Sequence, residues 1–219
     1  MSIARMLAAL TLALGIASTA SAAAVIDYAS LQPLADYSPV TTFGSTPEVS
    51  VTTRTFNSDA GKTTYSSSLA FWNSGYSSLP AVVFAETDGR GGEVTLTPIA
   101  GFSVNLLSFQ LGSHDAGTSG IGPSRTATLL RVVEVGTGTV MWDHGSPSVI
   151  VDSTRTLMPN VSSTAGLSVQ WGYDWNIGLN NLTFEAIRAG GATVIPVPPA
   201  VALFLGGLAL MGWATRKRN

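Results

Sequence analysis

The sequence predicts an all-β protein built as an antiparallel β-sandwich, with one helix added at each end of the chain. Between its ends the chain is rich in Ser, Thr, Gly and Val, and short β-prone runs alternate with turn signals, which is typical of sandwiches and barrels. This middle part has no stretch with the i, i+3, i+4 apolar spacing of an amphipathic helix. Each end instead carries a continuous apolar run of the kind that enters a membrane.

Residues 1–22 have the order of parts of a secretory signal peptide. Arg5 precedes an apolar run at 6–17, and the small residues at 20–22, Ala-Ser-Ala, match a cleavage site. We expect this segment to direct export of the chain by the Sec machinery and then to be removed by signal peptidase, so that the mature chain begins near Ala23. The alternative is an uncleaved N-terminal anchor, which the short apolar run disfavours.

Residues 23–189 have the length of one domain, the predicted β-sandwich. The net charge of the whole chain is −2, but without Arg5 and the three cations near the C-terminus, 7 basic residues remain against 13 acidic ones. This acidic balance argues against a nucleic-acid partner. The chain has no cysteine, which excludes disulfides, thiol chemistry and zinc bound by cysteine.

Within the domain, turn residues separate the β-prone runs. We expect strands at 49–55, 63–72, 81–87, 93–98, 102–111, 126–135, 139–143, 148–151, 167–171 and 182–187. The glycine-rich segments 88–92 and 136–138 are expected to be hairpin loops. The segment 25–47, with three prolines, is expected to be an extended entry strand with loops, and 174–181 a loop before the last strand.

The run 102–111 changes phase in its middle. Phe102, Val104 and Leu106 alternate with polar residues, and then the apolar positions move to Leu107, Phe109 and Leu111. Because the side chains of a strand alternate between its two faces, a shift of one residue predicts a bulge or a bend at this point.

Three aromatic residues near the end of the domain form a candidate binding surface. Trp171, Tyr173 and Trp175 would share one face if the chain were extended there, and amide and carboxylate side chains flank them. Flat aromatic faces with polar groups at their edges suit sugar rings, so the three residues are candidates for carbohydrate binding. The alternative is that they belong to the core of the sandwich, where alternating aromatic residues are common.

Catalysis has weaker support. Each of the two histidines, His114 and His144, is next to an aspartate, but neighbouring residues of a strand point to opposite faces and are poor partners in a triad. The nucleophile motif G-x-S-x-G is absent, and no local pattern nominates the pair of carboxylates that glycoside hydrolysis needs. We therefore expect a protein that is not an enzyme, with a secreted glycan hydrolase as the lesser alternative.

The chain ends in three consecutive parts. A linker at 190–195 leads to a proline-rich motif of Ile195, Pro196, Val197, Pro198 and Pro199. An uncharged apolar run at 200–214 follows, which as a helix would be roughly 22 Å long. Three cations, Arg216, Lys217 and Arg218, then hold the end of the chain on the cytoplasmic side. The tail, residues 196–219, is expected to be a single transmembrane helix with an accessible extended peptide before it.

This tail resembles the PEP-CTERM sorting tail of Gram-negative bacteria, with Val197 where glutamate is most familiar. The resemblance covers about the last 26 residues and implies processing by an exosortase near the proline motif. It also implies a link to exopolysaccharide and biofilm. Its alternative is a plain C-terminal anchor that is never cleaved.

The closing run IGLNNLTFEA, residues 177–186, resembles the last strand of exported jelly-roll sandwiches, many of them like carbohydrate-binding modules. That resemblance implies a jelly-roll-like sandwich. It also implies a structural calcium ion, with Asp27, Asn180, Asn181 and Glu185 as weak ligand candidates, although solvated acids and turn-forming asparagines explain these residues equally.

From the sequence we expect an exported protein that passes through the inner membrane to the cell surface or extracellular matrix of a Gram-negative bacterium. Its expected role there is structural or adhesive and linked to exopolysaccharide. The alternative function is that of a carbohydrate-binding module that recognises the exopolysaccharide itself.

Overall fold

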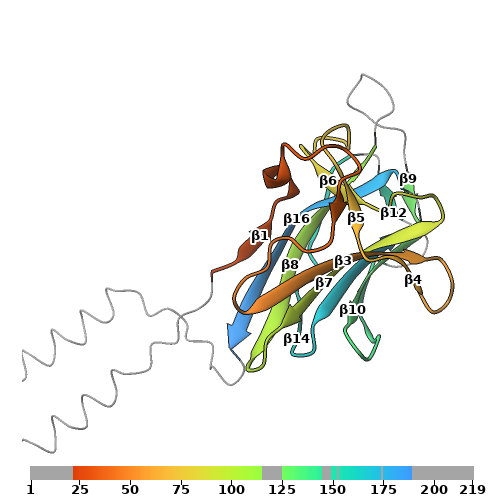
Figure 1. Cartoon of the computed structure of the whole chain (residues 1–219). Coiled ribbons are helices and arrows are strands. Elements are labelled where there is room, and N and C mark those ends of the chain that lie inside the picture. The colour runs from red at the N-terminus through yellow and green to blue at the C-terminus, as the bar shows by residue number, and fades with distance from the viewer. Residues whose placement is uncertain (1–21, 115–124, 145–148, 152, 174, 189–219) are drawn as a thin grey trace, which may run out of the picture. The chain divides into compact units, whose positions relative to one another are not determined.

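The computed structural model describes residues 22–114, 125–144, 149–151, 153–173 and 175–188 (Figure 1). These residues belong to one compact unit, Ser21–Ala189. Apart from Ala22, the predicted signal peptide lies outside the described ranges, and so does the whole C-terminal tail. Inside those ranges no helix has the length and the apolar character needed to cross a bilayer.

Two antiparallel sheets account for most of the unit. Sheet A has the strand order β13-β8-β16-β6-β5-β2, with β1 beside β16 and β14 beside β8. Its strands are β1 (Ala24–Ile26), β2 (Pro39–Val40), β5 (Leu69–Trp72), β6 (Val82–Phe84), β8 (Phe102–Ser113), β13 (Arg155–Leu157), β14 (Val161–Ser163) and β16 (Ile177–Arg188). Figure 1 shows β1 next to the long blue strand β16, with the green strand β8 on the other side of β16.

Sheet B has the strand order β11-β10-β15-β7-β3-β4. Its strands are β3 (Val49–Asn57), β4 (Thr64–Ser66), β7 (Arg90–Pro98), β10 (Leu129–Glu134), β11 (Val140–Asp143) and β15 (Leu167–Gly172). Two short strands, β9 (Arg125–Ala127) and β12 (Val149–Val151), pair with each other, and one 3-10 helix, η1 (Tyr28–Leu31), follows β1.

The core lies between the two sheets. Val51, Val94 and Trp171 from sheet B pack in one buried cluster with Leu106 and Phe184 from sheet A, and each is at most 1% exposed. Along β3 and β16 buried and less buried residues alternate, as expected when one face of a strand packs against the core. The prediction of an all-β protein with an antiparallel β-sandwich is therefore confirmed.

From β6 onward, apart from β9 and β12, the chain alternates between the sheets in groups of one or two strands: β6 lies in sheet A, β7 in sheet B, β8 in sheet A, β10 and β11 in sheet B, β13 and β14 in sheet A, β15 in sheet B and β16 in sheet A. This alternation overturns the expected hairpin at 88–92, because β6 and β7 belong to different sheets. Gly91 and Gly92 lie inside β7 rather than in a loop. A Cβ atom on Gly92 would lie 2.4 Å from Cζ2 of Trp171, so glycine is needed there for close packing rather than for a turn.

The phase shift in the run 102–111 corresponds to a real irregularity. In the pairing of β8 with β16, Leu106 lies opposite Phe184, whereas Ser108, two residues later, lies opposite Thr183. One strand therefore has an extra residue at this point, which is the bulge that the sequence predicts. The burial pattern changes phase with it, since Leu106 and Phe109 both face the core.

Other expectations have mixed outcomes. The turn at 136–138 joins the paired strands β10 and β11, as predicted. The expected loop at 174–181 is wrong in its second half, because β16 already begins at Ile177. The expected strand at 63–72 is two strands, β4 and β5, in different sheets. The short strands β2, β13 and β14 fall outside the strands expected from the sequence, since two or three residues carry too little alternation to be recognised.

Candidate functional site

The three aromatic residues expected to form one binding face lie in different surroundings. Trp171 lies on β15 in the core, is 1% exposed, and its Nε1–H donates to the backbone oxygen of Ile177 at 3.1 Å. Tyr173 lies edge-on to Phe56, with the ring centroids 6.2 Å apart. The reason is that β15 ends at Gly172, so the alternation that would align the three side chains does not continue beyond it.

Trp175 belongs to another aromatic group. Its half-buried ring packs near Phe84 at 6.4 Å and near His114 at 5.7 Å between centroids. Of the three predicted residues, Trp171 is a core residue as in the alternative interpretation, and the other two do not share a surface with it.

Two of the four weak calcium candidates lie together, but their oxygens bind backbone groups. The Oδ1 atom of Asn180 accepts hydrogen bonds from the backbone N–H groups of Tyr28 and Asn181, both at 2.7 Å. Asp27 caps η1 by accepting from the N–H of Ala29 at 2.9 Å. These bonds fasten the N-terminal segment onto β16. They also hold the Tyr28 ring inside the core, where burial raises the pKa of its hydroxyl.

The other two calcium candidates point elsewhere. The side chain of Asn181 donates to Oε1 of Gln110 at 2.7 Å, and Glu185 lies farther along β16, opposite Asn105. Among the described residues no group of three or more His, Cys, Asp or Glu side chains is placed to hold a metal ion.

The two histidines lie in separate places. His114 follows β8 and packs against Trp72 and Tyr76, while His144 follows β11 and packs near Trp142. Asp115, the neighbour of His114, lies outside the described residues.

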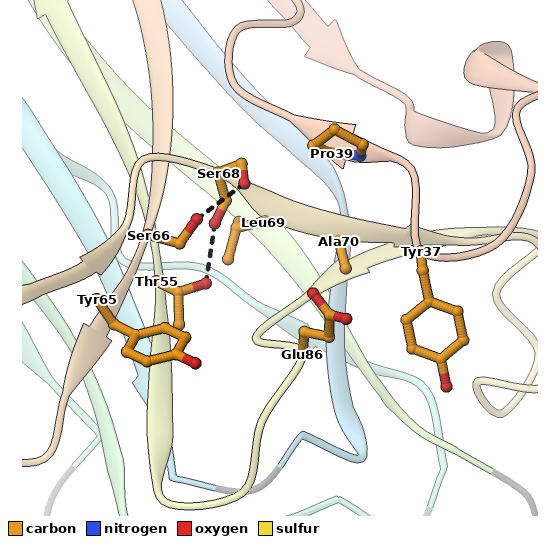
Figure 2. Close-up of a pocket in the computed structure, with 9 residues that line it drawn as sticks. All are labelled: Tyr37, Pro39, Thr55, Tyr65, Ser66, Ser68, Leu69, Ala70 and Glu86. Atoms are coloured by element: carbon orange, nitrogen blue, oxygen red, sulfur yellow. Dashed lines mark hydrogen bonds between the residues drawn. The ribbon is translucent and has the colours of Figure 1, made fainter.

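A small hollow opens where the edge strand β2 of sheet A and its neighbour β5 approach β3 and β4 of sheet B (Figure 2). It is lined by Tyr37, Pro39, Thr55, Tyr65, Ser66, Ser68, Leu69, Ala70 and Glu86. Its volume of about 40 Å³ holds water molecules but cannot enclose an organic ring. A ligand at this place must therefore lie across the opening rather than inside it.

Two tyrosines flank this hollow. Figure 2 shows Tyr65 on one side and Tyr37 on the other, with the Glu86 carboxylate between them. Tyr37 is 49% exposed and Tyr65 is 54% exposed, which is unusual for such large rings. Aromatic faces on both sides of a polar floor are therefore open to a ligand.

The floor of the hollow carries hydroxyl groups. Thr55 donates from Oγ1 to the backbone oxygen of Ser68 at 2.9 Å, and the hydroxyls of Ser66 and Ser68 are 3.0 Å apart. Each hydroxyl has one donor and two acceptor positions, so capacity remains for a ligand after these bonds are made. Glu86 is exposed and accepts no hydrogen bond from any residue that the structure describes.

Neighbouring residues fix both tyrosine rings. The guanidinium of Arg90 lies 4.4 Å from the centroid of the Tyr65 ring, a cation–π contact. Tyr37 packs edge-on against Trp72, with the centroids 5.1 Å apart, and its backbone N–H donates to the oxygen of Phe71 at 2.8 Å. The rings are thus held in place before any ligand arrives.

The sequence gives no local sign of this hollow. Tyr37, Tyr65 and Glu86 come from three segments that only the packing of the sheet edges brings together. The predicted sorting residues from Ile195 to Pro199, and the cations Arg216, Lys217 and Arg218, lie outside the described residues. Neither a comparison with protein-family models nor one with curated protein sequences finds a match for the chain.

Proposed function

We propose that this chain is an exported, non-enzymatic glycan-binding protein that holds exopolysaccharide at the cell surface or in the extracellular matrix of a Gram-negative bacterium. The observation that carries the binding role is the hollow flanked by Tyr37 and Tyr65, with a carboxylate and hydroxyls between the two exposed rings. Sugar rings have apolar C–H faces and hydroxyl edges. Aromatic side chains bind the faces, and the polar floor binds the edges.

Delivery is the second part of the proposal and rests on the sequence. An N-terminal signal peptide would direct export, and the C-terminal helix would hold the chain in the inner membrane until an exosortase acts near Pro196–Pro199. We further propose that the sandwich is of the jelly-roll kind. Its support is the repeated crossing of the chain between the two sheets from β6 onward and the pairing of the first strand, β1, with the last, β16.

Binding is proposed rather than hydrolysis because of the number of carboxylates that line the hollow. Cleavage of a glycosidic bond needs two acids that face each other across the substrate, roughly 5–9.5 Å apart. Among the residues lining the hollow, Glu86 is the single acid. This arrangement supports recognition of a sugar without attack on its linkage.

The delivery part is tested by the intact mass of the protein from surface and medium fractions of producing cells. We expect a mass that begins near Ala23 and ends between Pro196 and Pro199. A mass that retains Arg216, Lys217 and Arg218 would overturn the sorting proposal and leave an anchored protein.

The binding part is tested with the exopolysaccharide isolated from the same cells, using the processed protein and affinity electrophoresis. Tyr65→Ala and Tyr37→Ala are each expected to weaken binding by about tenfold, the value of one lost aromatic contact. Tyr65→Phe keeps the ring and is expected to bind nearly as well as the unchanged protein. Dextran serves as the control polysaccharide. Equal mobility of all proteins in gels with and without exopolysaccharide would refute the binding role.

A further inference from the structure

A second group of aromatic side chains continues from the hollow along sheet A. We call Trp72, His114 and Trp175 the aromatic ledge. Tyr37 packs edge-on against Trp72 at 5.1 Å, Trp72 against His114 at 5.4 Å, and His114 is tilted against Trp175 at 5.7 Å, all between ring centroids. The three ledge side chains are half-buried, so part of each ring remains open to solvent. Tyr37 therefore belongs both to the hollow and to the start of the ledge.

The ledge rests on a small apolar cluster that is separate from the main core. Tyr76 and Phe84, both fully buried, lie beneath Trp72 and Trp175. The hydroxyl of Tyr76 donates to the backbone oxygen of Trp175 at 3.0 Å, which fixes the segment before β16. The rings thus have little freedom to lose on binding a ligand, which lowers the entropic cost of binding.

Polar groups line the edge of the ledge next to Trp72. The amide of Gln32 donates to Oδ1 of Asn73 at 2.5 Å, and the Asp36 carboxylate accepts from the N–H of Asn73 at 2.8 Å. All three residues are exposed. The ledge therefore repeats the chemistry of the hollow, with aromatic faces beside amide and carboxylate groups.

We infer that the aromatic ledge is a second contact surface for the same polysaccharide, so that one glycan chain lies across the hollow and then along Trp72, His114 and Trp175. This inference rests on the proposed function and adds to it the class of ligand. Because the hollow cannot enclose a ring, a ligand would lie across the surface, and the protein would bind internal stretches of a long linear glycan rather than free sugars. The continuity of the two surfaces through Tyr37 is the observation that joins them.

The consequence is a dependence on chain length. A short fragment can occupy only one of the two surfaces, whereas a long one contacts both and gains the second set of contacts without a second loss of translational freedom. We expect long fragments to bind about tenfold more tightly than short ones, or more, which corresponds to at least one additional aromatic contact.

The test uses the processed protein and exopolysaccharide from the producing cells, partly hydrolysed and separated by size. Trp175→Ala, at the end of the ledge that does not contact Tyr37, is expected to remove the advantage of long fragments and to leave the binding of short ones unchanged. Tyr65→Ala is expected to weaken both. Trp142→Ala, which removes a half-buried tryptophan from β11 in sheet B, is the matched control and should change neither.

A second measurement needs no variant and stands even if Trp175→Ala fails to fold. Hydroxyl-radical oxidation of the unchanged protein should slow at Trp72 and Trp175 with long fragments, and stay constant at Trp142. Equal affinity for all fragment sizes together with unprotected ledge tryptophans would overturn this inference and leave the proposed function intact. Failure of every fragment to bind would overturn the proposed function itself. Protection of the ledge that rises with protein concentration, without glycan, would identify a second copy of the chain as its occupant and also overturn the inference.

Discussion

The outward faces of the two sheets differ in how their side chains are used. On sheet B, Arg54, Glu93, Gln170 and Arg131 form one hydrogen-bonded row across β3, β7, β15 and β10. On sheet A the residues facing outward near the end of β5 and β6 are apolar, and Trp72 lies over them half-buried. In the row on sheet B the polar groups bind one another, which leaves few of them to bind a ligand. The partly exposed aromatic ring on sheet A can still make a contact with one.

The row on sheet B is centred on one carboxylate. Glu93 is 5% exposed although it lies on an outward face, because the long side chains beside it cover it. It accepts from Arg54 at 2.6 and 2.9 Å and from the Gln170 amide at 2.5 Å. The hydrogen bond to Glu93 also raises the pKa of the Arg54 guanidinium, which therefore stays charged.

The largest expected effect comes from breaking this row at its centre. Glu93→Ala is expected to lower the free energy of unfolding by about 3 kcal/mol, because Arg54 and Gln170 then lose their shared acceptor. Urea unfolding monitored by circular dichroism measures the change. Glu185→Ala, the removal of a half-buried glutamate from β16, is the control, with an expected cost below about 0.5 kcal/mol. Similar costs for the two variants would mean that the row adds no stability.

On sheet A the corresponding test adds a methyl group at Gly178, next to Val82 and Tyr76 of the small apolar cluster. A Cβ atom at Gly178 would lie 2.5 Å from Cγ2 of Val82 and 2.9 Å from Cδ1 of Tyr76. Gly178→Ala is therefore expected to cost about 2 kcal/mol through overpacking. Gly61→Ala is the matched control, since the nearest atom to its added Cβ would be 3.8 Å away. Equal melting temperatures for both variants would contradict the tight packing of Tyr76 on the sheet.

A smaller effect is expected at the end of the row on sheet B. Arg131 donates from Nε to Oε1 of Gln170 at 2.8 Å and is only half-buried, so water can replace part of this bond. Arg131→Ala is expected to cost about 1 kcal/mol in urea unfolding, clearly less than Glu93→Ala. Arg188→Ala, at an exposed arginine that ends β16, should change stability by less than about 0.5 kcal/mol. An equal loss of unfolding free energy in the Arg131 and Glu93 variants would show that every member of the row contributes alike, and that Glu93 is not its centre.

The smallest expected effect concerns a carboxylate, that of Glu134, which has hydrogen bonds but no ion pair with any cation among the described residues. The hydroxyls of Ser163 and Thr137 donate to Glu134 at 2.8 and 2.9 Å, and this lowers the pKa of Glu134. A lowered pKa in the folded state means that these bonds stabilise the fold at pH above the ordinary glutamate value. That stability is lost as the pH falls through the folded-state pKa.

In an NMR titration, Ser163→Ala is expected to raise the pKa of Glu134 toward its ordinary value, and Thr137→Val to raise it by less. The order follows from Ser163 being the larger cause. An unchanged pKa in the Ser163 variant would show that the hydroxyl does not hold the carboxylate.

The sandwich and its bulge could be predicted because both affect the alternation of apolar and polar residues along the strands. Val49, Val51 and the residues that alternate with them show which face is buried, and Leu106 and Leu107 show where the period changes. A register shift moves the apolar positions of a strand, so it can be recognised without a structure.

Other features could not be predicted, for physical reasons. Gly92 is a glycine because of Trp171, which is 79 positions away in the chain, and nothing in its neighbourhood distinguishes it from a turn glycine. The aromatic alternation from Trp171 to Trp175 predicts a shared face only if the strand continues, and the strand ends at Gly172. The hollow depends on two sheet edges meeting, which no local pattern encodes.

The pairing of β1 with β16 has a mechanical consequence. Ala24 lies opposite Phe184 and Ile26 opposite Leu182, so the chain enters the domain and leaves it at the same end of β16. Trp175 lies just before the other end of this strand, which runs for 12 residues, or about 40 Å. If a polysaccharide bound to the ledge were pulled while the C-terminal tail was held, the tension would run along the covalent backbone of β16. The hydrogen bonds to β8 on one side would then be loaded in shear rather than opened one after another, so under the proposed function this strand would resist such a pull.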